Sequence, residues 1–345
     1  MELKWVNLPT CHAGDNNHRE YCRITSRERD HMKNGYTGKS SAFLRVSLYS
    51  LTIRLAVFLL PFFLIACDSR KNETYIPVYE SSSAAKQAVL IFGVHPLHNP
   101  QRLYEIYNPL VEYLNRNIPG ITITLEASRS YDEFEKKLDS RHLAFALPNP
   151  YQTVNSLQHG YHVFAKMGED DKFRGIIIVR KDSGINTVTD LTGRIVSFPA
   201  PTALAATMMP LYYLHTHGLD VNQDIKRLFS GSQESSIMNV YLGKSDAGAT
   251  WPPPWQAFVE RNPQIGAELE VKWETPSLLN NSLVARDDVP QQVVDKVKSL
   301  LVNLHTHEEG RHLLAALPLE YFESATDATY QPVRDFIEKY FETVH

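Results

Sequence analysis

Three short stretches of the sequence place a hydroxyl or amide side chain directly after an apolar run, where a chain can bind an anion. They are Pro148-Asn149-Pro150-Tyr151, Pro199-Ala200-Pro201-Thr202 and Gly231-Ser232-Gln233. Asn149, Thr202 and Ser232 are good N-cap residues, so each stretch predicts the first turn of a helix. A helix start leaves about four backbone N–H groups without intrahelical partners, and the cap satisfies one of them. The others attract negative charge, as does the helix dipole.

The stretch that begins at Thr202 covers its backbone least, because Ala203, Leu204, Ala205 and Ala206 follow. We expect the amides of residues 203–205 to face a bound anion beside the Thr202 hydroxyl. Asn, Ser and Thr caps are common, so an ordinary capped helix is the alternative at each of the three places.

Apolar strand-like runs alternate with helix-like segments, which is typical of α/β domains with parallel sheets. Strands are predicted over 89–94, 121–127, 143–147, 161–167, 175–180, 194–198, 225–230, 246–250, 269–273 and 281–286. Helices are predicted over 103–116, 130–139, 150–158, 202–217, 233–242 and 290–305. The carboxyl ends of parallel strands share one edge of a sheet, so the three helix starts should face one crevice.

The charge distribution argues against nucleic acid as a partner. The chain has 345 residues and a formal net charge of −4, but its first 66 residues carry 9 Lys or Arg and 5 Asp or Glu, which leaves −8 for the remainder. Binding to a phosphate backbone needs a basic face, and this body is acidic. Any anion must therefore be held by local hydrogen-bond donors.

The N-terminal region has the pattern of an export signal. Leu55–Ala66 reads LAVFLLPFFLIA and follows Arg45 and Arg54. This run is shorter than the roughly 20 apolar residues of a membrane span, so a signal peptide over about 32–66 is predicted, with a buried helix or a membrane anchor as the alternative. Residues 1–31 lack a periodic apolar pattern, and we interpret them as an N-terminal extension upstream of the signal peptide, of doubtful relevance to the mature protein.

The next residues, LIAC at 64–67, resemble the lipobox of bacterial lipoproteins. The resemblance implies that Cys67 is lipidated, with a flexible tether over 67–86, and Asp68 resembles an inner-membrane retention signal. The other cysteines, Cys11 and Cys22, precede the folded part, which therefore has no disulfide framework.

Neither a metal site nor a catalytic motif is predicted. The pairs His215/His217 and His305/His307 are two residues apart, and such residues do not share a helix face. Asp246 is expected to have a structural role. We predict no cofactor and no enzymatic activity, with an enzyme on the same fold as a distant alternative.

The order of the motifs resembles the periplasmic phosphate, phosphite and phosphonate-binding proteins of ABC importers. The likeness covers about 88–315 and is carried by YNPLVEYLNRNIPG, YDEFEKKLDSRHLAFALPNPY, the long stretch from Gly175 to Asp220, FSGSQESSIMNVYLGKSDAGATW and NNSLVARDDVP. It implies an α/β fold of two lobes joined by a two-segment hinge, each lobe a mostly parallel sheet flanked by helices. Lobe 1 would comprise 87–181 and 280–345, and lobe 2 would comprise 182–279.

The resemblance also implies a set of ligand-binding residues. It places donors to phosphonyl oxygens at Tyr107, Tyr151 and the turn formed by Thr202, Ala203 and Leu204. Packing is the alternative for each tyrosine, since the chain has 17. Asn149, Ser232 and Trp251 complete the expected site, Trp251 as a wall of the cleft or as packing for the turn at Pro252–Pro254.

Two departures from the family pattern bear on the ligand. Gln233 stands where phosphonate binders have a histidine, and Asn281 stands where an acidic residue holds a ligand's ammonium group. An aminophosphonate would leave its ammonium unpaired, which is costly. We therefore expect phosphate, phosphite, a simple phosphonate or a related small oxyanion as the ligand.

The sequence thus predicts a monomeric, lipid-anchored periplasmic protein that delivers a small oxyanion to an ABC permease in the inner membrane. A ligand sensor of the same fold, which presents its closed form to a membrane signalling protein, would share this binding chemistry and is the main alternative.

Overall fold

The computed structural model describes residues 88–317 and 319–344, which belong to the second of two compact units of the chain, Ser81–His345. The predicted extension 1–31, the signal peptide 32–66, the lipidation site Cys67 and the tether 67–86 lie outside the described residues. Within the described ranges, no helix has the length and apolar character that crossing a bilayer requires.

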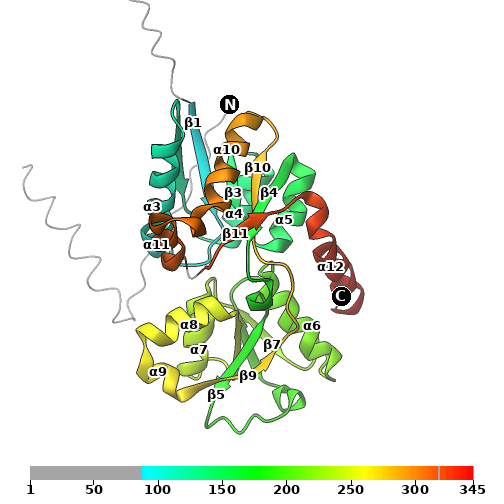
Figure 1. Cartoon of the computed structure of the whole chain (residues 1–345). Helices are drawn as coiled ribbons and strands as arrows, with labels where there is room; N and C mark the ends of the chain where they lie inside the picture. Colours follow the sequence, from blue (N-terminus) through cyan, green and yellow to red (C-terminus); the bar gives the residue numbers. More distant parts are fainter. Residues whose placement is uncertain (1–87, 318, 345) are drawn as a thin grey trace, which may run out of the picture. The chain divides into compact units, whose positions relative to one another are not determined.

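Six strands form the first sheet, and the elements around it are called the first lobe (Figure 1). In spatial order they are β11 (Phe322–Ser324), β4 (Tyr161–Met167), β10 (Ser282–Arg286), β3 (Phe145–Leu147), β1 (Ala88–Val94) and β2 (Ile121–Glu126). β1 pairs in parallel with β2 and β3, whereas β10 is antiparallel to β3 and β4, and β11 is antiparallel to β4. Figure 1 shows the orange β10 beside the green β4, so a late segment of the chain completes this sheet.

Helices accompany this sheet along the chain. They are α3 (Pro100–Asn117), α4 (Tyr131–Asp139), α5 (Pro150–Ser156), α10 (Gln291–Val302), α11 (Glu308–Ala316) and α12 (Gln331–Val344). Helix α12 contacts both α5 and α6 (Met209–Thr216), a helix of the second lobe. The C-terminal helix therefore touches both lobes.

Five strands form the second sheet, which defines the second lobe. In spatial order they are β7 (Lys226–Phe229), β6 (Ile195–Phe198), β8 (Ala247–Thr250), β5 (Ile176–Arg180) and β9 (Leu269–Glu274). β6 is parallel to β7 and β8, and β5 is antiparallel to its two neighbours. Besides α6, the helices of this lobe are α7 (Gln233–Tyr241), α8 (Pro252–Arg261) and α9 (Pro263–Glu268).

The strand β5 corrects the predicted lobe boundary. The sequence assigned residues up to 181 to lobe 1, but β5 pairs with β8 and β9 in the second sheet. Ile176–Val179 are buried, and the second sheet gives this strand a hydrogen-bonded neighbour on each edge. The chain thus crosses between lobes within 168–175 and returns within 275–281.

The two crossing segments are hydrogen-bonded to each other. The Gly175 amide donates to the Thr275 hydroxyl, and the Thr275 amide donates to the Gly175 carbonyl oxygen, both at 2.9 Å. These two hydrogen bonds hold the crossing segments together at Gly175 and Thr275. Each segment is short, so the two lobes are joined by only a few residues of backbone.

All ten predicted strands are present, as are the six predicted helical segments, with ends shifted by at most three residues. The sequence reading missed β11, α8, α9, α11 and α12. At Pro252–Pro254 it expected a turn, whereas these prolines begin α8. Proline is compatible with the first turn of a helix, because the N–H groups of that turn have no acceptor within the helix.

The helix predicted to start at Thr202 begins differently. Its first turn is a wide π-helical turn, Leu204–Met208, which continues into α6. The N-cap position is Ala203, with no capping side-chain bond, so the predicted capping role of Thr202 is wrong. The Ala203 amide bonds to the Ala200 carbonyl oxygen, which closes a turn and delays the helix.

We expect Ile178→Ala to lower the free energy of unfolding by about 2–5 kcal/mol, because its side chain is fully buried in the centre of β5. The control, Val89→Ala, changes a side chain that is 63% exposed and should stay within about 0.5 kcal/mol of the parent. Urea unfolding measures both, and equal losses would contradict the central place of β5.

Candidate functional site

A small cavity lies between the two lobes and is lined by the starts of several helices. We call it the inter-lobe cavity. About 10 Å³ of it is open to the centre of a water molecule, which is room for about one water. Its lining residues are His95, Tyr131, Asn149, Phe173, Ala203, Leu204, Ala205, Ala206, Gln233, Trp251 and Asn281.

The sheet topology explains why these residues meet. His95 and Asn149 follow β1 and β3 in the first lobe, and residues 203–206 and Trp251 follow β6 and β8 in the second. Asn281 precedes β10, which runs antiparallel, so its amino end lies at the same edge as the carboxyl ends of its neighbours. Ligands bind at this edge in open α/β sheets.

Five helix starts contribute to the lining, where the sequence predicted three. Tyr131 is the first residue of α4, Gln233 is the first residue of α7, and Trp251 is the N-cap of α8. Asn149 is the N-cap of α5, as predicted, and accepts a hydrogen bond from the Gln152 amide at 3.1 Å. The wide turn at Leu204–Met208 is the fifth.

The wide turn offers three unpaired backbone amides. Among the described residues, no group accepts a hydrogen bond from the amides of Leu204, Ala205 or Ala206, and all three residues line the cavity. The amides of the next two residues both bond to the Ala203 carbonyl oxygen, at 2.8 and 3.3 Å, so the unpaired set ends there. Buried N–H groups without partners are rare in proteins, and three together form a site for an anion.

Packing holds this turn in place. A Cβ atom on Gly175 would lie 2.4 Å from the Ala205 carbonyl oxygen, so only glycine lets the crossing segment approach the turn this closely. The Thr207 hydroxyl donates to the Ala200 carbonyl oxygen at 2.7 Å and fixes the turn from within.

Tyr131, which the sequence reading missed, faces Gln233 across the cavity. The Gln233 amide nitrogen Nε2 donates to the Tyr131 hydroxyl at 3.2 Å, and its oxygen Oε1 accepts from the Thr250 hydroxyl at 2.8 Å. The tyrosine oxygen is thus an acceptor to Gln233, and its own proton is free for a ligand. Burial raises the pKa of Tyr131 to about 12, so the hydroxyl stays protonated.

The sequence held a signal for Tyr131. Ser130 follows a strand and caps α4, accepting from the Glu133 amide at 3.1 Å. This is the strand-then-cap pattern that identified the other helix starts. The resemblance to known binding proteins directed attention to Tyr107 instead.

His95 and Asn281 bring hydrogen-bond acceptors into the cavity. His95 Nδ1 lies 3.0 Å from the Leu147 carbonyl oxygen, which can only accept, so Nδ1 carries the proton. Burial lowers the pKa of His95 to about 4, so the ring is neutral and Nε2 is an acceptor. Asn281 is fully buried, and its Oδ1 atom has no hydrogen-bond partner in the described part of the chain.

The structure places two predicted donors away from the cavity. Tyr107 is buried on α3 and lines a separate small cavity beyond Trp251, while Tyr151 is half-buried and packs against the main apolar cluster. Thr202 and Ser232 also lie off the lining. The Thr202 carbonyl oxygen accepts from Asn149 Nδ2 at 3.0 Å across the lobes, and Ser232 caps α7 as predicted.

Comparison with known proteins identifies the family of this chain. The family model of the periplasmic substrate-binding protein of phosphonate ABC transporters matches residues 92–330. The chain belongs to this family.

Its relatives are distant in sequence and similar in fold. The probable phosphite-binding protein PhnD1 of Prochlorococcus marinus is 25% identical over 201 residues, which are 54% of this chain and 66% of that protein. The structure of PhnD1 with methylphosphonate has a TM-score of 0.68 at 21% identity and covers 73% of this chain and 98% of that chain. A phosphonate-transporter binding protein of Pseudomonas aeruginosa has a TM-score of 0.69 at 18% identity, over 74% and 88%. The predicted family and two-lobed fold are confirmed.

The walls of the inter-lobe cavity are uncharged. His95 is neutral, and the other lining side chains carry no formal charge at pH 7. Trp251 and Phe173 supply an aromatic wall, with ring centroids 5.4 Å apart. An anion here would be held by neutral dipoles, and a ligand cation would have no counter-charge.

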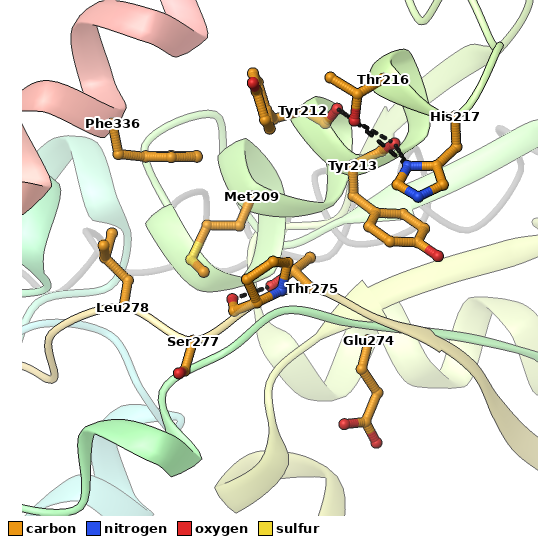
Figure 2. Close-up of a pocket in the computed structure, with 11 residues that line it drawn as sticks. Met209, Tyr212, Tyr213, Thr216, His217, Glu274, Thr275, Ser277, Leu278 and Phe336 are labelled. Carbon is orange, nitrogen blue, oxygen red and sulfur yellow. Dashed lines mark hydrogen bonds between the residues drawn. The ribbon is translucent and has the colours of Figure 1, made fainter.

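A larger cavity, of about 440 Å³, lies beside the hinge and suits an anion less well (Figure 2). Figure 2 shows Met209, Tyr213 and Phe336 around it, from α6 and α12. Its walls are mainly apolar, and they include the Glu274 carboxylate, whose ion pair with Arg174 has an N–O distance of 2.6 Å. This cavity is larger than the inter-lobe cavity, but the unpaired backbone amides line the inter-lobe cavity.

Asp246 and His217 have structural partners. The Asp246 carboxylate bonds to Arg194 and to the Ile195 amide, each at 2.9 Å. His217 stacks on Tyr213 with centroids 3.9 Å apart. The described residues contain no group of three or more His, Cys, Asp or Glu side chains placed to hold a metal ion.

We expect the stability of the protein to fall on acidification partly because of His95. The unfolded chain binds a proton near pH 6.5 and the folded ring near pH 4, so the free energy of unfolding decreases as the pH falls between these values. From pH 7 to pH 5 this part amounts to about 2 kcal/mol, and His95→Gln should remove it.

Urea unfolding of the parent and the variant at both pH values measures the difference. His312→Gln is the control, since this side chain is 80% exposed. An unchanged pH dependence in His95→Gln would contradict a buried neutral ring.

Proposed function

We propose that this protein captures a small phosphorus oxyanion, a simple phosphonate, phosphite or phosphate, in the inter-lobe cavity for an ABC importer. The observation that carries the proposal is the set of unpaired amides at Leu204, Ala205 and Ala206. The Tyr131 hydroxyl and the Gln233 amide group add donors from two other helix starts.

The strength of these donors is adequate. A hydrogen bond to a charged group contributes roughly 1.5–3 kcal/mol net, and micromolar affinity corresponds to about 8 kcal/mol. Three amides and one hydroxyl can therefore supply most of the binding free energy. Since the donors are neutral and buried, we expect the affinity to depend weakly on ionic strength.

Ligand entry requires the cavity to open, because its present volume fits about one water. Two hydrogen bonds join the lobes beside the cavity, from Asn149 to the Thr202 carbonyl oxygen and from Gln233 to Tyr131. We infer that the lobes separate by rotation at the crossing segments and close on the ligand, as hinged binding proteins do.

The uncharged walls favour ligands without an amino group. An ammonium group in the cavity would have no carboxylate to pair with, and burying an unpaired charge is costly. PhnD1, whose structure holds methylphosphonate, supports a ligand of this size.

Isothermal titration of the full chain with methylphosphonate, phosphite, phosphate, sulfate and 2-aminoethylphosphonate tests the function. We expect micromolar or tighter binding of at least one phosphorus oxyanion and no preference for the aminoethyl compound. Ala206→Asp places a carboxylate over the free amides, which is compatible with a helix start, and should weaken binding at least 100-fold. The neutral Ala206→Asn should weaken it less. Absence of binding by the parent chain would refute the proposal.

We further propose that Cys67 carries the lipid that holds the protein at the periplasmic face of the inner membrane. The basis is the LIAC sequence at 64–67 after the apolar run, followed by Asp68. Several acyl chains together give stable membrane attachment.

Expression of the full chain in a Gram-negative host with labelled palmitate tests the anchor. We expect label in the membrane-bound protein and its loss, with release from the membrane, in Cys67→Ser. The control is Cys22→Ser, which should retain both. Membrane retention of an unlabelled Cys67→Ser protein would instead indicate that the apolar run itself is the anchor.

A further inference from the structure

The inter-lobe cavity contains acceptors as well as donors, which a site for a fully deprotonated oxyanion does not need. Asn281 Oδ1 is fully buried and has no hydrogen-bond partner among the described residues. Its Nδ2 atom lies 3.6 Å from the Met167 sulfur, which has no hydrogen to donate. This contact assigns the amide orientation, so the unpaired atom is the oxygen.

The second acceptor is His95 Nε2. The Leu147 carbonyl oxygen fixes the proton on Nδ1, and no described residue hydrogen-bonds Nε2. The ring edge packs against Tyr131 and Phe134, with centroids 6.2 and 6.5 Å away, so the tautomer and the ring position are both set by the fold.

Both acceptors would repel the oxygens of a dianion. A buried acceptor that is left unpaired costs free energy, and one that faces a ligand oxygen without a proton costs more. A P–OH group relieves this conflict, because its one hydrogen can lie between the two acceptors in a three-centre hydrogen bond, while the other oxygens accept from the amides of residues 204–206.

We propose that the site selects the protonated monoanion of its phosphorus ligand, whose single P–OH hydrogen is shared between the acceptors His95 Nε2 and Asn281 Oδ1. This inference rests on the proposed function. It makes His95 and Asn281 specificity-determining residues that distinguish phosphonates from sulfonates, which carry the same charge without a proton to donate.

The pH dependence of binding follows from the ligand and not from the cavity walls. Burial lowers the pKa of His95 and of the neighbouring His98 to about 4, and it raises the pKa of Tyr131 to about 12. Charged groups act electrostatically on two of these side chains: Glu135 raises the pKa of Tyr131, and Arg102 and Arg261 lower that of His98. Between pH 6 and pH 9 the lining histidine and tyrosine keep their protonation states, so affinity should fall about tenfold per pH unit above the second pKa of the ligand.

The test compares methylphosphonate with methanesulfonate, a monoanion of similar shape, by isothermal titration of the full chain between pH 6 and pH 9. At pH 6 we expect methylphosphonate to bind at least tenfold more tightly than methanesulfonate. The affinity for methylphosphonate should decrease as the pH rises. His95→Phe and Asn281→Leu should weaken methylphosphonate at least tenfold and leave methanesulfonate unchanged or improved.

The control variant is Tyr131→Phe, which removes a donor and should weaken both ligands by similar factors. Circular dichroism checks that each variant is folded. If a variant is not folded, two measurements on the parent chain test the inference: the affinity for methylphosphonate against methanesulfonate, and the change in methylphosphonate affinity between pH 6 and pH 9. Equal affinity for the two ligands, or affinity that rises with pH, would overturn the inference while the oxyanion-binding function stands. Absence of binding by every phosphorus oxyanion would overturn both.

Discussion

Three backbone amides without acceptors among the described residues, at Leu204, Ala205 and Ala206, are the observation on which the proposed oxyanion site depends. An ordinary helix start would expose a similar number of amides, but a capping side chain would satisfy one of them. Here the N-cap is Ala203, which cannot cap, and the first turn is widened so that two amides share one carbonyl oxygen. The same turn therefore concentrates donors and removes the side chains that would compete with a ligand.

The rest of the architecture serves to keep that turn facing a space between two lobes. β6 delivers it to the carboxyl edge of the second sheet, and Gly175 on the crossing segment lets the hinge pack against it. From the first lobe, α4 and α5 present Tyr131 and Asn149 to the same space. Because donors come from both lobes, a bound anion would hold them together, which links binding to closure.

Neutral walls distinguish this site from one that relies on charged side chains. A buried charge needs a partner, whereas neutral dipoles oriented by helix starts carry no such requirement. The cost appears elsewhere, in an unpaired Asn281 oxygen and a histidine held in its neutral form. These are the positions at which ligand specificity should be most sensitive to substitution.

The sequence by itself determined ten of the eleven described strands, the caps at Asn149 and Ser232, the family and the edge of the sheets at which an anion would bind. These depend on apolar runs and capping groups that act within a few residues of each other. Only the tertiary structure decided that β5 joins the second sheet, that Thr202 does not cap, and that Tyr131 lines the cavity while Tyr107 and Tyr151 do not. Which face of a helix meets the other lobe, and which polar atom is left without a partner, depend on packing between segments more than 50 residues apart, such as Asn149 with Thr202 or Tyr131 with Gln233.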